Sequence, residues 1–300
     1  MDIFSFDKSI NEPCAIALGY FDGVHLGHRR VIDSAVEYAE KNKLKSAAFT
    51  FADVKKSSKK SCSGALYSSE HRAELLKKCG ADFVIMPDFS QFCGLSPNEF
   101  VALLKEKYSA RALFCGEDYR FGKGAEGNVE TLKELCKKQK IELFVEKKVK
   151  FWGEDISSSR IKEALLRGDV SLAEKLLGRA YSFKASVVSG EHIGSKKLYP
   201  TINQPLGLDG AKIKNGVYAS RAIIGGKRYN AVTNIGVCPT VKNIDEAVAE
   251  TYILDKNIEL YGQSVEVELV EFLRDERRFE SIERLKAQIS EDIKRAKEIL

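Results

Sequence analysis

The sequence predicts an α/β protein in which a doubly wound parallel sheet is followed by an antiparallel β-barrel. Short apolar runs alternate with helical patterns over residues 14–155. Residues 181–272 instead contain β patterns separated by Gly, Pro, Asn and Asp. The chain has 300 residues, which is more than one hydrophobic core usually supports. We therefore expect two domains, residues 1–180 and 181–300.

The first half has the pattern of parallel strands joined by crossover helices. Ser96-Pro97-Asn98-Glu99 is a capping box with proline at the first helical position, so it predicts the start of a helix. The expected strands are residues 15–18, 46–51, 82–86, 112–115 and 142–145. The expected helices are residues 29–42, 70–79, 97–108 and 129–138.

The second half contains strand patterns without helices between them. Two short helices are expected first, at residues 158–167 and 171–177, and each is followed by a glycine. The expected strands are residues 181–188, 216–224, 229–234, 247–254 and 265–272. Antiparallel strands of this kind can remove their open edges by closing into a barrel. Apolar residues at helical spacing over residues 281–300 predict a C-terminal helix.

The composition excludes several classes of protein. Hydrophobic residues make up 44% and charged residues 30%, which is typical of a folded soluble domain, and a net charge of +5 does not mark a nucleic-acid binder. No apolar stretch is long enough to span a membrane, and no signal peptide is evident. The seven cysteines are scattered and never spaced as CxxC, which argues against a disulfide framework and against a zinc site. We expect a cytoplasmic protein with small-molecule substrates, without nucleic-acid or membrane partners; protein partners are unknown.

The segment Gly-Tyr-Phe-Asp-Gly-Val-His-Leu-Gly-His, residues 19–28, lies where the first strand ends and the first helix begins. In a doubly wound sheet, ligands bind at this edge. Glycines let the backbone approach a ligand, and the free N–H groups and dipole of a helix N-terminus attract phosphate. His25 and His28 are three residues apart, so both can donate to phosphate oxygens. The segment therefore predicts a phosphate-binding site.

HxGH after a first strand resembles the signature of the adenylyltransferase superfamily, and the longer segment is similar to that of bacterial bifunctional riboflavin kinase/FAD synthetases. Further blocks agree with this family in order along nearly the whole chain: residues 115–122, 156–161, 200–203, 234–240 and 250–255. The resemblance implies an FMN adenylyltransferase in residues 1–180 and a riboflavin kinase barrel in residues 181–300. The kinase would convert riboflavin and ATP to FMN. The first domain would then make FAD and pyrophosphate from FMN and ATP, and both steps would require Mg²⁺.

The resemblance also assigns roles to individual residues. His25 and His28 would stabilise charge on the phosphates during adenylyl transfer, and Glu250 would be the base of the kinase reaction. The other residues that it assigns to the nucleotide in the first domain are Gly19, Phe21, Asp22, Gly23, Gly27, Gly116, Asp118, Ser157, Ser158, Ser159 and Arg160. In the barrel it assigns Gly194, Thr201 and Asn203 to the nucleotide, Thr201 and Asn203 to Mg²⁺, and Asn234 and Arg274 to the flavin. Taken alone, Glu250 fits a surface carboxylate, and Ser157-Ser158-Ser159 fits a helix N-cap.

Two departures from the family pattern leave alternatives open. After Thr50-Phe51 the chain reads Ala52-Asp53-Val54-Lys55, without the His and Pro of the family's TFxPHP-like string. Before Pro200, Ser195 and Leu198 replace an arginine and a glycine. One alternative is therefore that only one activity is retained, and another is a flavin-binding protein without turnover.

Two further alternatives come from single motifs. The HxGH block alone also fits a related nucleotidyltransferase that acts on another phosphorylated substrate. Residues 122–127 are a literal GxGxxG, which fits a dinucleotide-dependent oxidoreductase, although they do not directly follow a strand.

Overall fold

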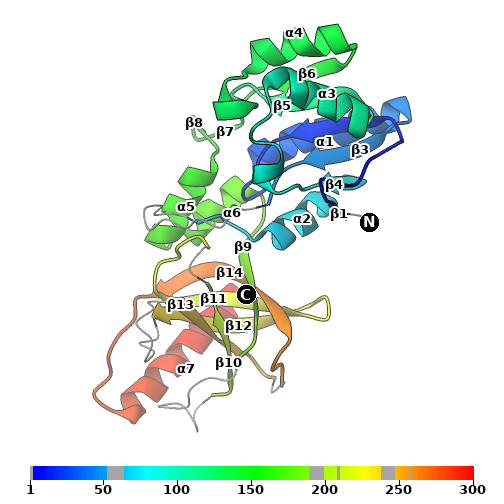
Figure 1. Cartoon of the computed structure of the whole chain (residues 1–300). Helices are drawn as coiled ribbons and strands as arrows, with labels where there is room; N and C mark the ends of the chain where they lie inside the picture. Colours follow the sequence, from blue (N-terminus) through cyan, green and yellow to red (C-terminus); the bar gives the residue numbers. More distant parts are fainter. Residues whose placement is uncertain (1–2, 53–63, 189–198, 208–209, 238–246, 257–258) are drawn as a thin grey trace. The chain divides into compact units, whose positions relative to one another are not determined.

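The computed structural model describes residues 3–52, 64–188, 199–207, 210–237, 247–256 and 259–300, in two compact units (Figure 1). The first unit comprises Met1–Ser61 and Tyr67–Ser158, and the second comprises Cys62–Leu66 and Ser159–Leu300. The predicted fold class is confirmed, because one unit contains a parallel sheet and the other an antiparallel one. In this division α5 (Ser158–Arg167) and α6 (Val170–Leu177) group almost wholly with the second unit. The domain boundary at residue 180 stays a prediction.

The first unit is built on six parallel strands in the order β1-β4-β3-β2-β5-β6. Their bounds are β1 (Ile3–Phe4), β2 (Cys14–Leu18), β3 (Lys45–Phe49), β4 (Phe83–Ile85), β5 (Ala110–Gly116) and β6 (Glu142–Glu146). From β2 the chain builds outward through β3 and β4, and then crosses to the other side of β2 to form β5 and β6. The direction of winding therefore changes between β2 and β5. In open α/β sheets, ligands bind beyond the carboxyl ends of the strands at such a point.

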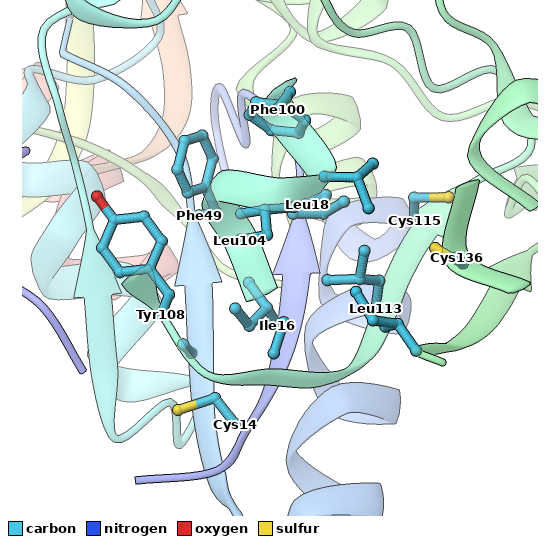
Figure 2. Packing of buried hydrophobic residues seen from close by; sticks show 14 of the residues in the cluster. Cys14, Ile16, Leu18, Phe49, Phe100, Leu104, Tyr108, Leu113, Cys115 and Cys136 are labelled. Carbon is cyan, nitrogen blue, oxygen red and sulfur yellow. The ribbon is translucent and has the colours of Figure 1, made fainter. Parts of the chain in front are cut away.

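Helices cover both faces of this sheet. On one face lies α1 (Leu26–Asn42), which buries Val31, Ile32 and Ala35. On the other lie α3 (Pro97–Lys107) and α4 (Val129–Gln139). Figure 2 shows that second core, in which Ile16 and Leu18 of β2 pack with residues of α3 and α4. Alternation along β2 turns Ala15 and Ala17 toward the other face, and their small side chains leave room for α1.

Local signals place the helix starts. The capping box at Ser96 is present: its hydroxyl accepts from the Glu99 N–H at 3.4 Å, and the Glu99 carboxylate accepts from the Ser96 N–H at 2.8 Å. At α4 the Asn128 side-chain oxygen accepts the Thr131 N–H at 2.9 Å, and Ser68 caps α2 (Ser69–Lys78). The two-residue strand β1 and the hairpin of β7 (Lys150–Phe151) and β8 (Glu154–Asp155) were not predicted, because two residues carry no periodicity.

The second unit contains a six-stranded antiparallel sheet in the order β10-β13-β12-β11-β14-β9. The strands are β9 (Tyr181–Ser186), β10 (Thr201–Pro205), β11 (Gly216–Ile224), β12 (Lys227–Val237), β13 (Ala247–Ile253) and β14 (Ser264–Arg274), and α7 (Ile282–Ile299) packs against β11, β12 and β14. The outer strands β10 and β9 approach each other. The Gln204 side-chain amide donates to the carbonyl oxygens of Ala185 and Val265, both at 2.8 Å, and the Val188 N–H donates to the Asn203 oxygen at 2.9 Å. These bonds close the predicted barrel.

Strand β10 was missed by the sequence analysis, although it carries two predicted site residues. It follows Pro200 and ends at Pro205, and only one of its five residues is strongly apolar. The buried side of β10 is formed by Ile202 and Gln204, and Gln204 is fully buried. A polar side chain that closes a barrel by hydrogen bonding leaves no hydrophobic alternation to detect.

Several expectations concern features that the structure describes only in part. No helix in the described ranges is both long and apolar enough to cross a membrane. The cysteines within the described ranges, Cys14, Cys79, Cys93, Cys115 and Cys136, are all free. Cys62 and Cys238 lie outside them.

The buried cysteines lead to a prediction about reactivity. Burial raises the pKa of the Cys14 and Cys115 thiols to about 12 and that of Cys136 to about 11, so at pH 8 all three are neutral and poorly nucleophilic. We expect iodoacetamide at pH 8 to leave them unmodified in the native protein and to label them in urea, as measured by peptide mass spectrometry. Labelling at equal rates in both states would contradict their placement in the core.

Candidate functional sites in the two units

The loop between β2 and α1 has a strained backbone. Phe21, Gly23 and Val24 have φ values of 55°, 88° and 42°. A positive φ is costly for a β-branched residue such as valine. The side chains of Phe21 and Val24 are almost completely buried and hold the loop in this conformation. Strain of this kind persists only where the surroundings enforce it, and it concentrates at functional sites.

The two histidines of this loop stack at the start of α1. Their ring centroids are 3.6 Å apart with an interplanar angle of 15°. Nδ1 of His25 accepts the backbone N–H of His28 at 3.2 Å, which makes His25 the N-cap of the helix. Since Nδ1 accepts, a neutral His25 carries its proton on Nε2. The arrangement therefore combines an Nε2–H donor with a helix N-terminus, and both favour an anion.

Glycines at two positions leave the space that these rings occupy. A Cβ on Gly27 would lie 3.2 Å from the His25 ring and 3.9 Å from the Ile156 carbonyl oxygen. A Cβ on Gly19 would lie only 2.7 Å from the Phe21 ring, which itself meets His28 edge-on at 5.4 Å between centroids. Side chains larger than hydrogen would displace the rings at both positions.

The serine segment reaches the same loop. The Ser158 hydroxyl donates to the backbone oxygen of Asp22 at 2.7 Å, and Ser157 is the residue directly before Ser158. The Asp22 side chain is buried. Ser159 and Arg160 follow in the first turn of α5 and group with the second unit. Within the first unit, the structure thus brings the predicted segments 19–28 and 157–158 together.

At the end of β5, Asp118 forms an ion pair that the sequence analysis missed. The Lys148 ammonium lies 3.2 Å from the Asp118 carboxylate and 3.4 Å from that of Asp155. Hydrogen bonding to Asp118 raises the pKa of Lys148 above its ordinary value, and Asp155 adds to the effect. A Cβ on Gly116 would lie 3.3 Å from the Asp118 carboxylate. Lys148 stands among other lysines, so nothing in the sequence distinguishes it.

The GxGxxG segment has a packing role. A Cβ on Gly122 would lie 2.9 Å from the Pro97 ring, and one on Gly127 would lie 2.7 Å from the Phe121 ring. The segment forms a three-residue 3-10 helix, Lys123–Ala125; β5 ends six residues before Gly122, and the long helix α4 begins only after Gly127, at Val129. A dinucleotide-binding fingerprint requires such a helix directly after a strand. The geometry therefore gives the oxidoreductase interpretation no support.

Beside the histidine loop lies a partly exposed group of rings, here called the aromatic face: Tyr20, Phe51 and Phe89. These residues follow the carboxyl ends of β2, β3 and β4. The Tyr20 and Phe51 rings stack with centroids 4.7 Å apart, and Phe89 lies 5.1 Å from Phe51. Tyr20 is 36% exposed and Phe89 39%. The aromatic face was not predicted, because no periodicity links three residues at the ends of three strands.

In the barrel, strand register aligns four predicted residues in one row. Asn203 of β10 pairs with Glu250 of β13, and Glu250 pairs with Asn234 of β12. Asn234 pairs with Val217 of β11, which pairs with Arg274 of β14. Residues paired across neighbouring strands share a face of the sheet. Thr201 lies two positions from Asn203 and therefore has the same orientation. Gly194 lies outside the described residues.

Glu250 has a second carboxylate nearby. Glu250 as a whole is an exposed residue, but its carboxyl group is partly shielded from water by the surrounding protein. This desolvation raises the pKa of Glu250, and the negative charge of Glu276 raises it further. The Glu276 carboxylate lies against Gly236, where a Cβ would collide with it. Glu276 was missed because the charged connector after β14 fits an ordinary solvated turn.

Arg274 is held firmly by α7. Its Nε donates to both carboxylate oxygens of Asp292 at 2.9 and 3.0 Å, and Nη2 donates at 2.8 Å. The two side chains are only 12% and 4% exposed. The Gln288 amide adds a bond to Asp292 at 3.1 Å. The predicted flavin residue Arg274 thus also joins β14 to the C-terminal helix.

Comparisons with known proteins agree across the chain. The FAD synthetase family matches residues 7–160, and the riboflavin kinase family matches residues 177–300. A bifunctional riboflavin kinase/FMN adenylyltransferase of Escherichia coli K12 is 32% identical over 301 residues, covering 99% of this chain and 96% of that protein. The protein of the same name from Bacillus subtilis is 34% identical, covering 95% and 92%. A crystal structure described as a macrolide-efflux protein from Streptococcus pneumoniae has a TM-score of 0.86 at 29% identity, covering 98% of this chain and 99% of that one.

The buried pair of Arg274 and Asp292 leads to a stability prediction. Asp292→Ala leaves a guanidinium with little access to water, so we expect the free energy of unfolding to fall by about 3 kcal/mol. The matched control is Glu268→Ala, which removes an equally bidentate partner from Arg228, a side chain that is 64% exposed. The control should cost less than about 1 kcal/mol. Urea unfolding of the second unit, followed by circular dichroism, would measure both. Equal losses in the two variants would contradict the structural role of Asp292.

Proposed function

The chain belongs to the family of bifunctional riboflavin kinase/FMN adenylyltransferases, and we propose that its two units carry the two activities separately. The second unit phosphorylates riboflavin with ATP, giving FMN and ADP. The first unit transfers the AMP group of a second ATP to FMN, giving FAD and pyrophosphate. The observation that carries this assignment is that each unit contains its own set of the predicted residues: the stacked histidines in one and the row through Glu250 in the other.

In the first unit, ATP binds beyond the carboxyl ends of β2 and β5. The phosphates lie at the N-terminus of α1, near His25, His28 and the hydroxyls of Ser157 and Ser158. An oxygen of the FMN phosphate attacks the α-phosphorus in line, the new P–O bond forms, and pyrophosphate leaves with the electron pair of the broken bond. The histidine N–H groups stabilise the charge that builds on the phosphate oxygens. The transfer is direct and involves no covalent enzyme intermediate.

The acceptor of this transfer carries a flat three-ring group, which the aromatic face can receive. Tyr20 directly follows Gly19 of the histidine loop, and Phe51 follows the neighbouring strand. Partly exposed aromatic rings stack favourably on other flat rings. We place the isoalloxazine of FMN here, with its phosphate directed toward His25 and His28.

In the second unit, Glu250 acts as the general base. It takes the proton of the terminal ribityl hydroxyl while the hydroxyl oxygen attacks the γ-phosphorus of ATP, and ADP leaves. A carboxylate of raised pKa is a stronger base, which suits this role. Asn234 and Arg274 continue the same row, so the flavin chain lies along it. The resemblance places Gly194 at the nucleotide.

The donors on β10 suit Mg²⁺. Thr201 and Asn203 offer neutral oxygen ligands next to the carboxylate of Glu250. Among the described residues, no three His, Cys, Asp or Glu side chains are grouped to hold a metal. This sparse set fits Mg²⁺, which usually keeps waters and phosphate oxygens as most of its ligands. When bound, the ion neutralises charge on the transferred phosphoryl group. The cytoplasmic location and the lack of nucleic-acid and membrane partners stay predictions.

The central prediction separates the two activities. The protein is incubated with riboflavin, ATP and Mg²⁺, and riboflavin, FMN and FAD are separated by chromatography over time. The unaltered chain should form FMN and then FAD. His28→Ala should stop at FMN, because it removes a group that stabilises charge in adenylyl transfer. Glu250→Gln should leave riboflavin unchanged yet still convert added FMN to FAD.

Each other outcome of this assay would support one of the alternative functions. FMN without FAD in the unaltered chain would mean that the first unit has lost its activity. FAD formed only from added FMN would place the loss in the barrel. Binding of both flavins without any product would indicate a non-catalytic flavin protein, and failure to bind either flavin would favour a nucleotidyltransferase for another phosphate.

Packing around the histidines leads to a second prediction. Gly27→Ala should lower the turnover of FMN to FAD by about 10-fold or more, because a small displacement of the His25 ring disturbs alignment of the phosphates. Riboflavin kinase activity should not change. Gly94→Ala is the matched control, because no atom lies within 4 Å of a Cβ there. An unaltered adenylyl rate in Gly27→Ala would show that the ring position does not matter.

A further inference from the structure

One charged side chain in the first unit is completely buried and is not among the residues that sequence analysis assigned to either reaction. Arg72 lies on the inner side of α2, between His71 and Ala73, and its exposed fraction is 0%. Arginine is almost never fully buried unless specific contacts compensate for lost hydration. The contacts of Arg72 therefore indicate what its burial achieves.

The Arg72 guanidinium contacts both stacked members of the aromatic face. Its central carbon lies 4.5 Å from the centroid of the Tyr20 ring, within the range of a cation–π interaction. Its Nη2 donates to the backbone oxygen of Phe51 at 2.6 Å. One side chain thus contacts both Tyr20, which follows Gly19, and Phe51, which lies two residues after the end of β3. These two residues lie more than 30 positions apart in the sequence.

Neighbouring bonds fix the same two residues through the backbone. The Thr50 hydroxyl donates to the Tyr20 oxygen at 2.7 Å, and Thr50 is fully buried. The Gly19 N–H donates to the Phe49 oxygen at 3.2 Å. These bonds set the separation of the two chains at the backbone, and they do not involve the Tyr20 ring. The guanidinium lies over that ring and restricts it.

We propose that Arg72 is a positioning residue for the acceptor of adenylyl transfer: by holding Tyr20 and Phe51 in their stack, it sets the surface on which the flavin ring is received. This inference rests on the proposed function, which places the flavin ring on the aromatic face. A guanidinium can stack on a ring through its plane and donate from its edge at the same time. A lysine ammonium is a point charge without a planar face, so it reproduces this pair of contacts less well than arginine.

The test is steady-state kinetics of FMN adenylylation by the full chain. Arg72→Lys should raise the KM for FMN by about 10-fold, which is the size expected when an aromatic contact is lost, while kcat and the KM for ATP change less than twofold. Riboflavin kinase activity should be unaltered. Arg30→Lys is the matched control: it makes the same exchange in an arginine of α1 that is 65% exposed and bonded to Glu146. Its kinetics should match those of the unaltered chain.

A further variant tests the stack from the side of Tyr20. Tyr20→Leu leaves Arg72 in place and should raise the KM for FMN to a similar extent, so the test stands even where Arg72→Lys fails to fold. Combining the two changes should add little, because both remove one interaction. Equal effects of Arg72→Lys on kcat and on both KM values would show a general structural role and overturn the inference.

The outcomes also separate this inference from the proposed flavin site. Phe89→Ala changes the aromatic face without touching the contacts of Arg72. If Tyr20→Leu or Phe89→Ala raises the KM for FMN while Arg72→Lys does not, the flavin site stands and the role of Arg72 is wrong. If none of the three variants alters the KM for FMN, the aromatic face does not bind the flavin, and both ideas fail together.

Discussion

Backbone hydrogen bonding between neighbouring strands is the constraint on which both candidate sites depend. In the barrel, Asn203, Glu250 and Asn234 come from three segments of the chain, and only the register of β10, β13 and β12 places them side by side. A shift by one residue would turn Glu250 into the barrel interior and Thr251 outward. The buried hydroxyls of Thr233 and Thr251, 2.9 Å apart, oppose such a shift because it would separate them. In the first unit, the parallel register brings the ends of β2, β3 and β4 to one edge, where Tyr20, Phe51 and Phe89 meet.

Electrostatics at the first site follow from the same junction. The helix that begins after the strained loop directs its N-terminus toward the edge of the sheet, and His25 caps it with Nδ1. The helix N-terminus and the Nε2–H of His25 both favour an anionic ligand. They do so without a lysine or arginine inside the loop itself. In the proposed function, the phosphates of ATP supply the negative charge.

Sequence patterns predicted most of the secondary structure, and the failures have physical causes. Apolar periodicity and the capping box at Ser96 located the long elements to within a few residues. Strand β10 escaped because its inward Gln204 stabilises the closure by hydrogen bonds to Ala185 and Val265, without a hydrophobic side chain. The motifs identified segments that the structure brings together, such as Ser158 with the loop at Asp22. They could not identify Lys148, Glu276 or Arg72, whose positions depend on tertiary contacts between distant segments.

The sequence departs from the family pattern directly after Phe51, and the described contacts of Phe51 involve residues outside the altered string. The Phe51 ring stacks on Tyr20, and its backbone oxygen accepts from Arg72; both partners lie outside the altered string. Ala52 still pairs with the strand edge, because its N–H donates to the Pro87 oxygen at 3.0 Å. Within the described residues, Phe51 is therefore held by Tyr20 of the loop after β2 and by Arg72 of α2, and Ala52 is held by Pro87 after β4. None of these three partners belongs to the altered string. If the flavin is received on the aromatic face as proposed, these contacts favour retention of the acceptor site, because they do not depend on the histidine and prolines of the family pattern.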